Sequence, residues 1–511
     1  MDKKRGLLNV SVSITFKIII LIGGIAVRRF LIDYVGNEVN GLNSLYLSII
    51  GFLAVAELGV GSAITFCMYK PIVEGENDKV SALYFLFKKL YLIIGIIILA
   101  AGIGVMPFLP YLAKDYAELE VNLYITFALM LLSVVITYFF SAKVSLINAY
   151  KNDYITTTVN SLMLVLQYVL QITVLIFTRS YVWYLVCRIV VAFIQWVILD
   201  IITQRKYPII LKNKVKLDIE TATRVRKTVK AMFMHKIGGV LVNAVDSVVI
   251  SAFIGVVILG KYSNYMTIMS SMIGVLDLCF IPLVSVIGHT CVEESKENVI
   301  RYFRFFHAFN FALGVIFFLG YFAVIDSVVI ICFGVDLVMD WTIPFIITLN
   351  YFIQFMRRSA LLFRDSTGTF YNDRYKPLFE GLTNLVLSIL FVQWFGVVGV
   401  IVATIITDMF ICHIVEPHVL YKYAFGTKAK NYYLINYGYM VIFAALLVLM
   451  YFIRLSFDSA WLTLLVNGVI AVAVALVPCG ALVLLNPEFK VFIKNQVAKL
   501  KKIIFKKKRN V

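Results

Sequence analysis

Charged residues are scarce in this sequence. Asp, Glu, Lys and Arg make up 15% of its 511 residues, whereas hydrophobic residues make up 61%. A soluble globular domain has about 25% charged and roughly 45–50% apolar residues. The composition therefore excludes a soluble globular protein and predicts an all-α polytopic membrane protein.

The sequence also lacks the motifs of metal, redox and nucleotide chemistry. Its seven cysteines stand singly, without a CxxC pair or a His/Cys ligand spacing, so we expect neither a disulfide framework nor a zinc site. No GxxxxGKS/T motif occurs, which excludes a P-loop for ATP. We therefore expect no cofactor, no metal and no catalytic residue.

Long apolar runs fill most of the chain instead. A bilayer core of about 30 Å is crossed by about 20 residues of helix. By that measure the sequence predicts fourteen transmembrane helices, near 9–32, 42–68, 89–109, 121–142, 155–178, 181–203, 231–254, 262–289, 304–332, 341–359, 377–395, 397–420, 433–453 and 461–485.

The distribution of basic residues provides an independent test, because Lys and Arg concentrate in cytoplasmic loops. With the N-terminus inside, 38 of the 47 Lys and Arg fall in inner segments or at the inner ends of the spans, and 4 fall in outer loops. Inserting or deleting one span would destroy this alternation. We therefore expect both termini in the cytosol, with the protein in the cytoplasmic membrane.

Two inner segments are strongly basic. Residues 204–230 read as a cytosolic linker, and 486–511 as an amphipathic tail helix with its apolar residues on one face. Such segments bind anionic headgroups. The net charge of +18 is therefore expected to meet membrane lipid rather than nucleic acid.

A weak internal repeat divides the chain. Gly36 and Gly41 recur as Gly255 and Gly260 at an offset of 219, and YKNDY at 150–154 recurs as YNDRY at 371–375. Transport folds often contain such repeats. We expect an N-lobe at 1–203 and a C-lobe at 231–430, related by a pseudo-two-fold axis along the membrane normal, with two extra helices at 431–485.

Five basic residues lie inside predicted spans, where they are costly. Lys17 and Arg28 are eleven residues apart and share a helical face, whereas Arg29 points about a third of a turn away. The second repeat carries Lys236, Asn243 and Ser247 at the equivalent positions of its first helix.

Two interpretations of this basic stripe remain open. Arg28 and Arg29 either extend to the outer headgroups or line a cavity that binds an anion such as pyrophosphate, which suits the guanidinium fork. Arg188 is a weaker candidate for the same wall. Asn243 and Ser247 are candidate polar residues of the cavity.

Four acidic residues inside predicted spans are candidate coupling or latch groups. Glu57 lies at the depth of Lys17, and Asp277 at that of Lys236, so each is expected to form an ion pair. These pairs either only neutralise buried charge or exchange partners as the lobes move. Asp246 and Asp408 either titrate or bind a cation, or are satisfied structural groups.

Several motifs resemble one known family. VGNEVNGLNSLY at 35–46, AELGVGSAI at 56–64, MYKP at 68–71, NDRYKPLFEGLTNLVLSIL at 372–390, FGVVGVIVATIITDMF at 395–410 and EPHVLYKYAF at 416–425 are similar to polysaccharide flippases of the multidrug/oligosaccharidyl-lipid/polysaccharide exporter superfamily. The similarity is to members from Gram-positive capsule and exopolysaccharide gene clusters.

The resemblance implies an undecaprenyl-pyrophosphate-linked oligosaccharide as substrate, carried to the outer leaflet by alternating access. Its partners would be membrane lipids and the polymerase and glycosyltransferases of the same pathway. One alternative is a cation-coupled drug antiporter of the same superfamily. The other is a polysaccharide polymerase, which the short outer loops disfavour, so the chain is not expected to be an enzyme.

Overall fold

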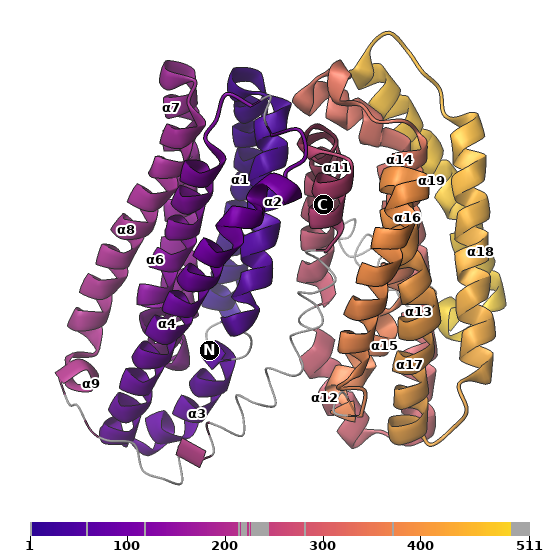
Figure 1. Ribbon diagram of the computed structural model, residues 1–511. Coiled ribbons are helices and arrows are strands. Elements are labelled where there is room, and N and C mark those ends of the chain that lie inside the picture. The colour runs from indigo at the N-terminus through magenta and orange to yellow at the C-terminus, as the bar shows by residue number, and fades with distance from the viewer. Residues whose placement is uncertain are drawn as a thin grey trace, which may run out of the picture. The chain divides into compact units, whose positions relative to one another are not determined.

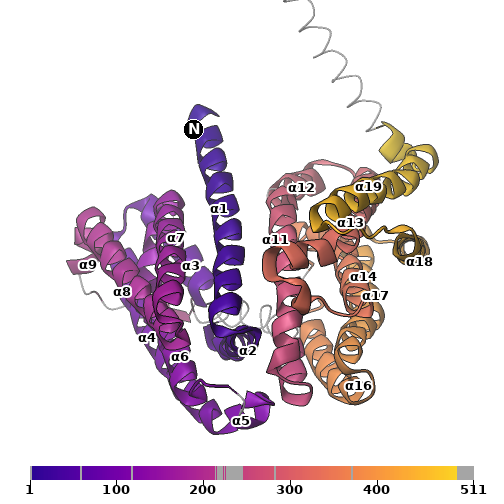
Figure 2. The same cartoon turned by 90° about the horizontal axis from the view of Figure 1, so that it is seen from above.

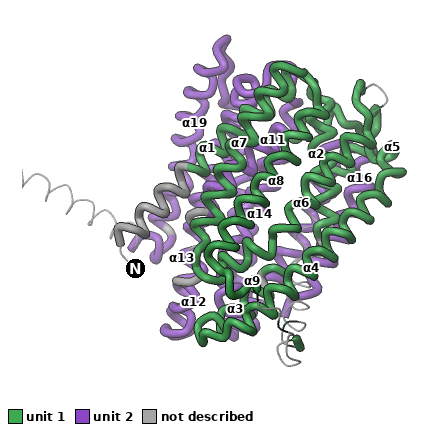
Figure 3. Tube along the Cα trace, turned by 90° about the vertical axis from the view of Figure 1, so that its left-hand side faces the viewer, with its two compact units in different colours: residues 1–263 green, residues 264–511 purple. Residues whose placement is uncertain are grey.

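The computed structural model describes the chain except residues 1–2, 58–59, 117–118, 213–214, 216–221, 224, 226–244, 281–282, 370–371 and 492–511. It describes no side chains for residues 3–15, 55–56, 62–63, 278–279, 285–286 and 485. The chain forms two compact units, Met1–Ser263 and Asn264–Val511, which Figure 3 distinguishes by colour. The predicted lobe boundary at 204–230 lies mostly outside the described residues and stays a prediction.

The described part of unit 1 is helical and contains no strand. Residues 245–253 are helical, and α11 (Val256–Phe280) begins in this unit. Its other elements are α1 (Lys3–Val35), α2 (Asn37–Leu53), η1 (Ala54–Glu57), α3 (Val60–Glu74), α4 (Asn77–Val105), η2 (Met106–Phe108), α5 (Leu109–Leu112), α6 (Leu123–Ala149), α7 (Asp153–Thr178), α8 (Tyr181–Lys206) and α9 (Pro208–Lys212).

Unit 2 is likewise helical over its described residues, and it contains two π-helical turns, η6 and η7. After α11 its elements are α12 (Leu283–Glu293), α13 (Lys296–Phe333), η4 (Val335–Leu337), α14 (Thr342–Met356), α15 (Arg358–Ser366), α16 (Lys376–Thr407), η6 (Asp408–Cys412), α17 (His413–Val419), η7 (Leu420–Phe425), α18 (Lys430–Ile453) and α19 (Ala460–Leu485).

Eight helices among the described residues are long and apolar enough to cross a membrane, which supports a multi-pass membrane protein. One of them, Lys376–Phe425, covers two of the predicted spans. At Gly396 its backbone leaves the helical region, with φ 58° and ψ −136°, at the point where the sequence predicts the two spans to meet. The total of fourteen spans and the location of the termini stay predictions.

Unit 1 is a bundle in which α7 packs against α1 and α8, and α6 packs against α8 and α4 (Figures 1 and 2). Small residues allow close packing, as is usual between membrane helices. A Cβ on Gly102 of α4 would overlap Leu131 of α6, and one on Gly23 of α1 would lie 2.6 Å from the ring of Tyr168 in α7. Large apolar side chains such as Ile22 and Val169 are more than half exposed on the outside of the bundle, where lipid would cover them.

The repeated glycines form matching turns. Gly36, before α2, has φ 114°, and Gly255, before α11, has φ 134°. Residues with side chains rarely adopt such angles. The repeat that the sequence predicts at an offset of 219 therefore has the same backbone conformation in both copies.

The helices that follow these turns contact each other reciprocally within unit 1. A Cβ on Gly41 would overlap the carbonyl oxygen of Val256, and a Cβ on Gly260 would overlap that of Asn37. The amide of Asn37 donates to the Val257 carbonyl at 2.9 Å, and that of Asn40 donates to the Gly260 carbonyl at 3.2 Å. Equivalent positions thus exchange contacts, as in a two-fold interface.

Unit 2 is arranged around the 38-residue helix α13, which packs against α14, α18 and α19 (Figure 1). Aromatic rings fill its core. Phe352 of α14 stacks on Phe443 of α18, with centroids 3.7 Å apart, and Phe303 of α13 contacts the rings of Phe363, Tyr421, Phe425 and Tyr432. After α19, residues 487–491 are helical, but the predicted tail helix otherwise lies outside the described residues.

We predict that Gly41→Ala destabilises the protein by about 1–3 kcal/mol, because the added methyl group cannot fit against the Val256 carbonyl. Gly51→Ala is the matched control, since it lies in the same helix with nothing within 4 Å of its Cβ position. That variant should be neutral or slightly stabilising. Thermal unfolding of both variants in detergent measures the difference, and equal unfolding temperatures would contradict the prediction.

Candidate functional site

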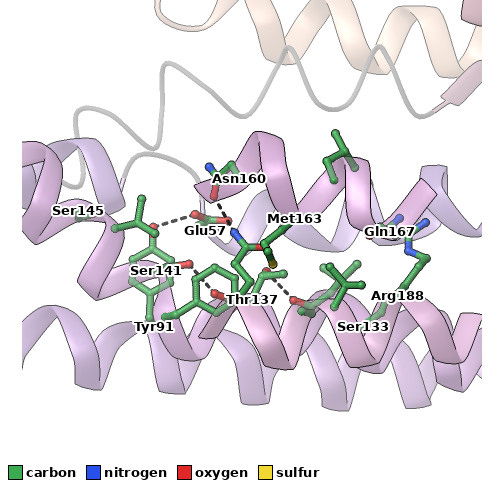
Figure 4. A pocket seen from close by; sticks show the side chains of 17 residues that line it. Glu57, Tyr91, Ser133, Thr137, Ser141, Ser145, Asn160, Met163, Gln167 and Arg188 are labelled. Carbon is green, nitrogen blue, oxygen red and sulfur yellow. Dashed lines mark hydrogen bonds between the residues drawn. The ribbon is translucent and has the colours of Figure 1, made fainter. Parts of the chain in front are cut away.

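A polar cavity of about 470 Å³ lies inside unit 1 among η1, α4, α6, α7 and α8 (Figure 4). This volume is typical of small-molecule sites, at roughly 300–1,000 Å³. Two side chains of opposite charge line it, Glu57 from η1 and Arg188 from α8. Its uncharged polar lining consists of Tyr91, Ser133, Thr137, Ser141, Ser145, Asn160, Gln167 and Gln195.

One wall of the cavity is a hydroxyl stripe on α6. Ser133, Thr137, Ser141 and Ser145 recur every four residues and therefore share one helical face. The first three donate to carbonyls of the preceding turn at 2.7–2.9 Å, so their oxygen lone pairs remain able to accept from a ligand. The sequence analysis missed this stripe, although its period of four inside a predicted span was the signal.

Side-chain amides form the facing wall. Gln195 of α8 donates to the Asn160 oxygen of α7 at 2.6 Å, which joins the two helices across the cavity wall. Gln167 also lines the cavity and donates to Gln171 at 3.4 Å. Amides both donate and accept hydrogen bonds, so hydroxyls and amides together suit a ligand rich in hydroxyl groups.

Glu57 is the last residue of η1, the turn that follows α2 and precedes α3. Its carboxylate accepts a hydrogen bond from the Tyr91 hydroxyl at 2.8 Å (Figure 4). Gly61 permits this approach, because a Cβ there would lie 2.6 Å from the same hydroxyl. The expected ion pair with Lys17 is absent from the described residues, where Lys17 is exposed on α1. Matching the two groups by depth thus did not predict which side chains meet.

Arg28 of α1 and Arg188 of α8 both lie within electrostatic range of the buried Tyr184, which is one turn before Arg188 in α8. Arg28 also donates to the Ser263 hydroxyl at 2.9 Å. The small residue Gly24, one turn before Arg28, faces the Tyr168 hydroxyl, which would lie 3.4 Å from an added Cβ. Of the two arginines, only Arg188 is among the described residues that line the cavity.

The other basic candidates are not part of this group. Arg29 forms an ion pair with Asp33 at 2.6 Å, and the two side chains are 38% and 41% exposed, so Arg29 lies on the surface of α1. Lys236 and Asn243 lie outside the described residues. Asp246 and Ser247 are half-buried in the helical segment 245–253.

Unit 2 contains a buried ionic cluster. The guanidinium of Arg357 binds both carboxylate oxygens of Glu416, at 2.6 and 3.1 Å, and its NH1 also donates to Asp408 at 2.6 Å and Glu380 at 3.3 Å. Lys376 contacts Glu416 at 2.5 Å and Glu380 at 2.8 Å. Three carboxylates thus face two cations, and no side chain in the cluster is more than 14% exposed.

The sequence analysis identified only Asp408 of this cluster as a candidate. Lys376 and Glu380 lie in the motif 372–390, Asp408 in 395–410 and Glu416 in 416–425, whereas Arg357 lies outside the motifs that carry the family resemblance. The expected ion pair between Asp277 and Lys236 involves a residue outside the described part of the chain and stays a prediction. Within the described residues, Asp277 has another partner. It pairs with Arg358 at 2.6 Å, and Arg358 also lies over the Phe280 and Phe355 rings.

The described residues of unit 2 also place Glu380, Asp408 and Cys412 close enough to share a ligand, with one donor atom of each within 4.8 Å of the others. One oxygen of Asp408, Oδ2, is buried and has no hydrogen-bond partner among the described residues. Two cationic side chains face the three carboxylates of the cluster, so one negative charge is not balanced. A single proton or monovalent cation would balance it.

No protein-family model matches the chain, and no curated protein matches its sequence. Solved structures do match its fold. The lipid II flippase MurJ, in an inward closed conformation, matches with a TM-score of 0.66 and 12% identity over 96% of this chain and 100% of that one. An inward-facing multidrug resistance MATE family transporter of the MOP superfamily matches with a TM-score of 0.61 and 14% identity over 79% and 95%.

The chain has the fold of these transporters. The fold that the resemblance implies is thereby confirmed. Membership of the superfamily and the similarity to its capsule-type members stay predictions. Both matched proteins are a flippase or a transporter by name, which agrees with the expectation that this chain is not an enzyme.

We predict that Glu416→Gln destabilises the protein by about 3–5 kcal/mol, because it leaves the buried charges of Arg357 and Lys376 without their shared partner. Glu74→Gln is the matched control, since Glu74 forms an exposed pair with Lys70. Loss of the Glu74–Lys70 pair should lower the free energy of unfolding by less than about 1 kcal/mol. Unfolding temperatures of the two variants test this, and an unchanged value for Glu416→Gln would show that the cluster does not stabilise unit 2.

Proposed function

We propose that this protein is a flippase that moves a pyrophosphate-linked oligosaccharide lipid from the inner to the outer leaflet by alternating access. The observation that carries the proposal is the cavity of unit 1, which is lined with hydroxyls, amides and the guanidinium of Arg188, with Arg28 near the same tyrosine, Tyr184. The fold shared with the lipid II flippase MurJ supports it.

The two parts of the site suit the two polar parts of such a substrate. Guanidinium groups bind pyrophosphate oxygens through charge-assisted hydrogen bonds. The α6 hydroxyl stripe and the amides of α7 and α8 can accept from and donate to sugar hydroxyls. The prenyl chain is apolar and remains in lipid, since its transfer into a polar cavity would be unfavourable. The pathway that supplies the sugar is proposed to be that of a cell-surface polysaccharide.

We predict that Arg28→Ala and Arg188→Ala each weaken binding of the pyrophosphate-linked lipid about 10- to 100-fold, because each removes a charge-assisted hydrogen bond of about 1.5–3 kcal/mol. The double variant should stop export and cause lipid-linked oligosaccharide to accumulate on the inner leaflet. Arg29→Ala is the matched control, since Arg29 forms a surface pair with Asp33. Normal export by the double variant, at normal protein level, would overturn the proposed site.

A cation-coupled drug antiporter is the second candidate function, and Glu57 favours it. This carboxylate lines the cavity and would attract an organic cation. The fold match to a multidrug resistance transporter points in the same direction. Drug accumulation in cells that lack the gene, with and without its restoration, separates the two functions. Reduced accumulation that depends on Glu57 would favour the antiporter.

We also propose that Asp408 is the group that couples transport to an ion gradient. It lies in the π-helical turn η6, and such turns occur frequently at functional sites. The groups that face it are Arg357, Glu380, Lys376, Cys412 and Glu416. A proton or monovalent cation on Asp408 would balance the three carboxylates against the two bases.

We predict that Asp408→Asn removes the response of transport to an imposed proton or sodium gradient without lowering stability, because the amide leaves two carboxylates facing two cations. Asp326→Asn is the control, since Asp326 pairs with Arg454 outside the cluster. Substrate flipping in proteoliposomes with and without the gradient is the measurement. A gradient response that survives in Asp408→Asn would assign the coupling to another group.

A further inference from the structure

A second polar cavity, of about 500 Å³, lies in unit 2 where α13 and α18 begin. Residues from α13, η7, α18 and the segment after α19 line it. It is separate from the ionic cluster, none of whose five residues lines it.

The sequence predicts that these helix ends lie on the cytosolic side of the membrane. Helix α13 is about 57 Å long at 1.5 Å per residue, which is longer than the bilayer core of about 30 Å. Its first turns therefore reach into the headgroup region.

Two buried polar atoms of this cavity have no hydrogen-bond partner among the described residues. They are Nε2 of His307 and the hydroxyl of Tyr432, in side chains that are 4% and 3% exposed. Buried polar atoms without partners are costly, so they indicate a ligand. The other ring nitrogen of His307 lies 3.0 Å from Ser359 Oγ, which itself donates to a backbone carbonyl. Nε2 is then the acceptor of the ring and is available to accept a hydrogen bond from a ligand.

Charged groups surround the mouth of the same cavity. Arg304 and Lys428 contribute two positive charges and Glu488 one negative charge, and all three side chains are exposed or half-exposed. Asn431 adds an amide. Two cations with one carboxylate suit a phosphate whose substituent carries a hydrogen-bond donor. The phosphate would meet Arg304, Lys428 and Tyr432, and the donor would meet Glu488 and His307.

An apolar cavity of about 670 Å³ adjoins this polar one. Tyr302, Phe305, Phe306 and Val491 line it, and it shares Pro487 and Glu488 with the polar cavity. The shared wall is held in place, because Asn486 accepts from the Phe489 backbone at 2.9 Å and the Phe489 ring stacks on Phe305. A polar and an apolar cavity side by side have the same arrangement as the headgroup and acyl chains of a lipid.

We infer that these two cavities bind one phospholipid of the inner leaflet, with its phosphate and a donor-bearing headgroup in the polar cavity and its acyl chains in the apolar one. Phosphatidylglycerol meets these requirements, since its phosphate is anionic and its glycerol carries hydroxyl donors. Phosphatidylcholine has the same phosphate but no donor. Inorganic phosphate has the anion without the chains.

The experiment uses the full-length protein, purified and delipidated in detergent, and native mass spectrometry to count bound lipid during titration. Phosphatidylglycerol should bind at least about 10-fold more tightly than phosphatidylcholine, and inorganic phosphate should not compete with it at equal concentration. Tyr432→Phe removes one oxygen and keeps the ring, so it should fold normally and bind phosphatidylglycerol about 10-fold more weakly. Arg304→Gln with Lys428→Gln should bind still more weakly.

The matched control is Lys422→Gln with Lys430→Gln, because it removes the same charge from neighbouring exposed positions that do not line either cavity. Its affinity should equal that of the wild type. Equal losses in the control and in the Arg304/Lys428 variant would reduce the effect to general surface charge and overturn the proposal. Equal binding of the two lipids, unchanged binding by Tyr432→Phe, or competition by inorganic phosphate would also overturn it.

Discussion

The close approach of two glycine-marked helices is the constraint on which the geometry of unit 1 depends. Because Gly41 and Gly260 have no side chains, α2 and α11 approach until Asn37 and Asn40 bond to backbone carbonyls of the other copy. Ser263 lies one turn beyond Gly260 and is thereby placed where Arg28 can donate to it. A larger residue at either glycine would separate the helices and move Ser263 away from Arg28.

The sequence predicted this contact only in part. Glycine and helical period are local signals, so the repeat at an offset of 219, the turn at Gly396 and the separate orientations of Arg28 and Arg29 could all be inferred from spacing. Which side chains meet depends on how helices are rotated about their axes, and spacing does not specify this rotation. Glu57 was therefore assigned to Lys17, whereas the structure gives it the hydroxyl of Tyr91.

The ionic cluster shows why sequence motifs can resemble those of a family without revealing which residues contact one another. Lys376 and Glu380 are one turn apart in α16, but Arg357 and Glu416 come from other segments of unit 2. No helical period relates them, so only the tertiary fold brings them together. Breaking such a cluster exposes the remaining charges to a low-dielectric interior, which is strongly unfavourable.

Under the proposed function, the two units make different electrostatic contributions to one cycle. An anion that moves outward across an inside-negative membrane gains about 2.3 kcal/mol per charge for every 100 mV. The arginines of unit 1 bind that anion but need not supply the driving force. The cluster of unit 2 has one more carboxylate than bases, and any movement of its helices is easier when a proton or cation on Asp408 cancels the excess. The ion would then permit the return of the empty protein, whereas the membrane potential would favour export itself.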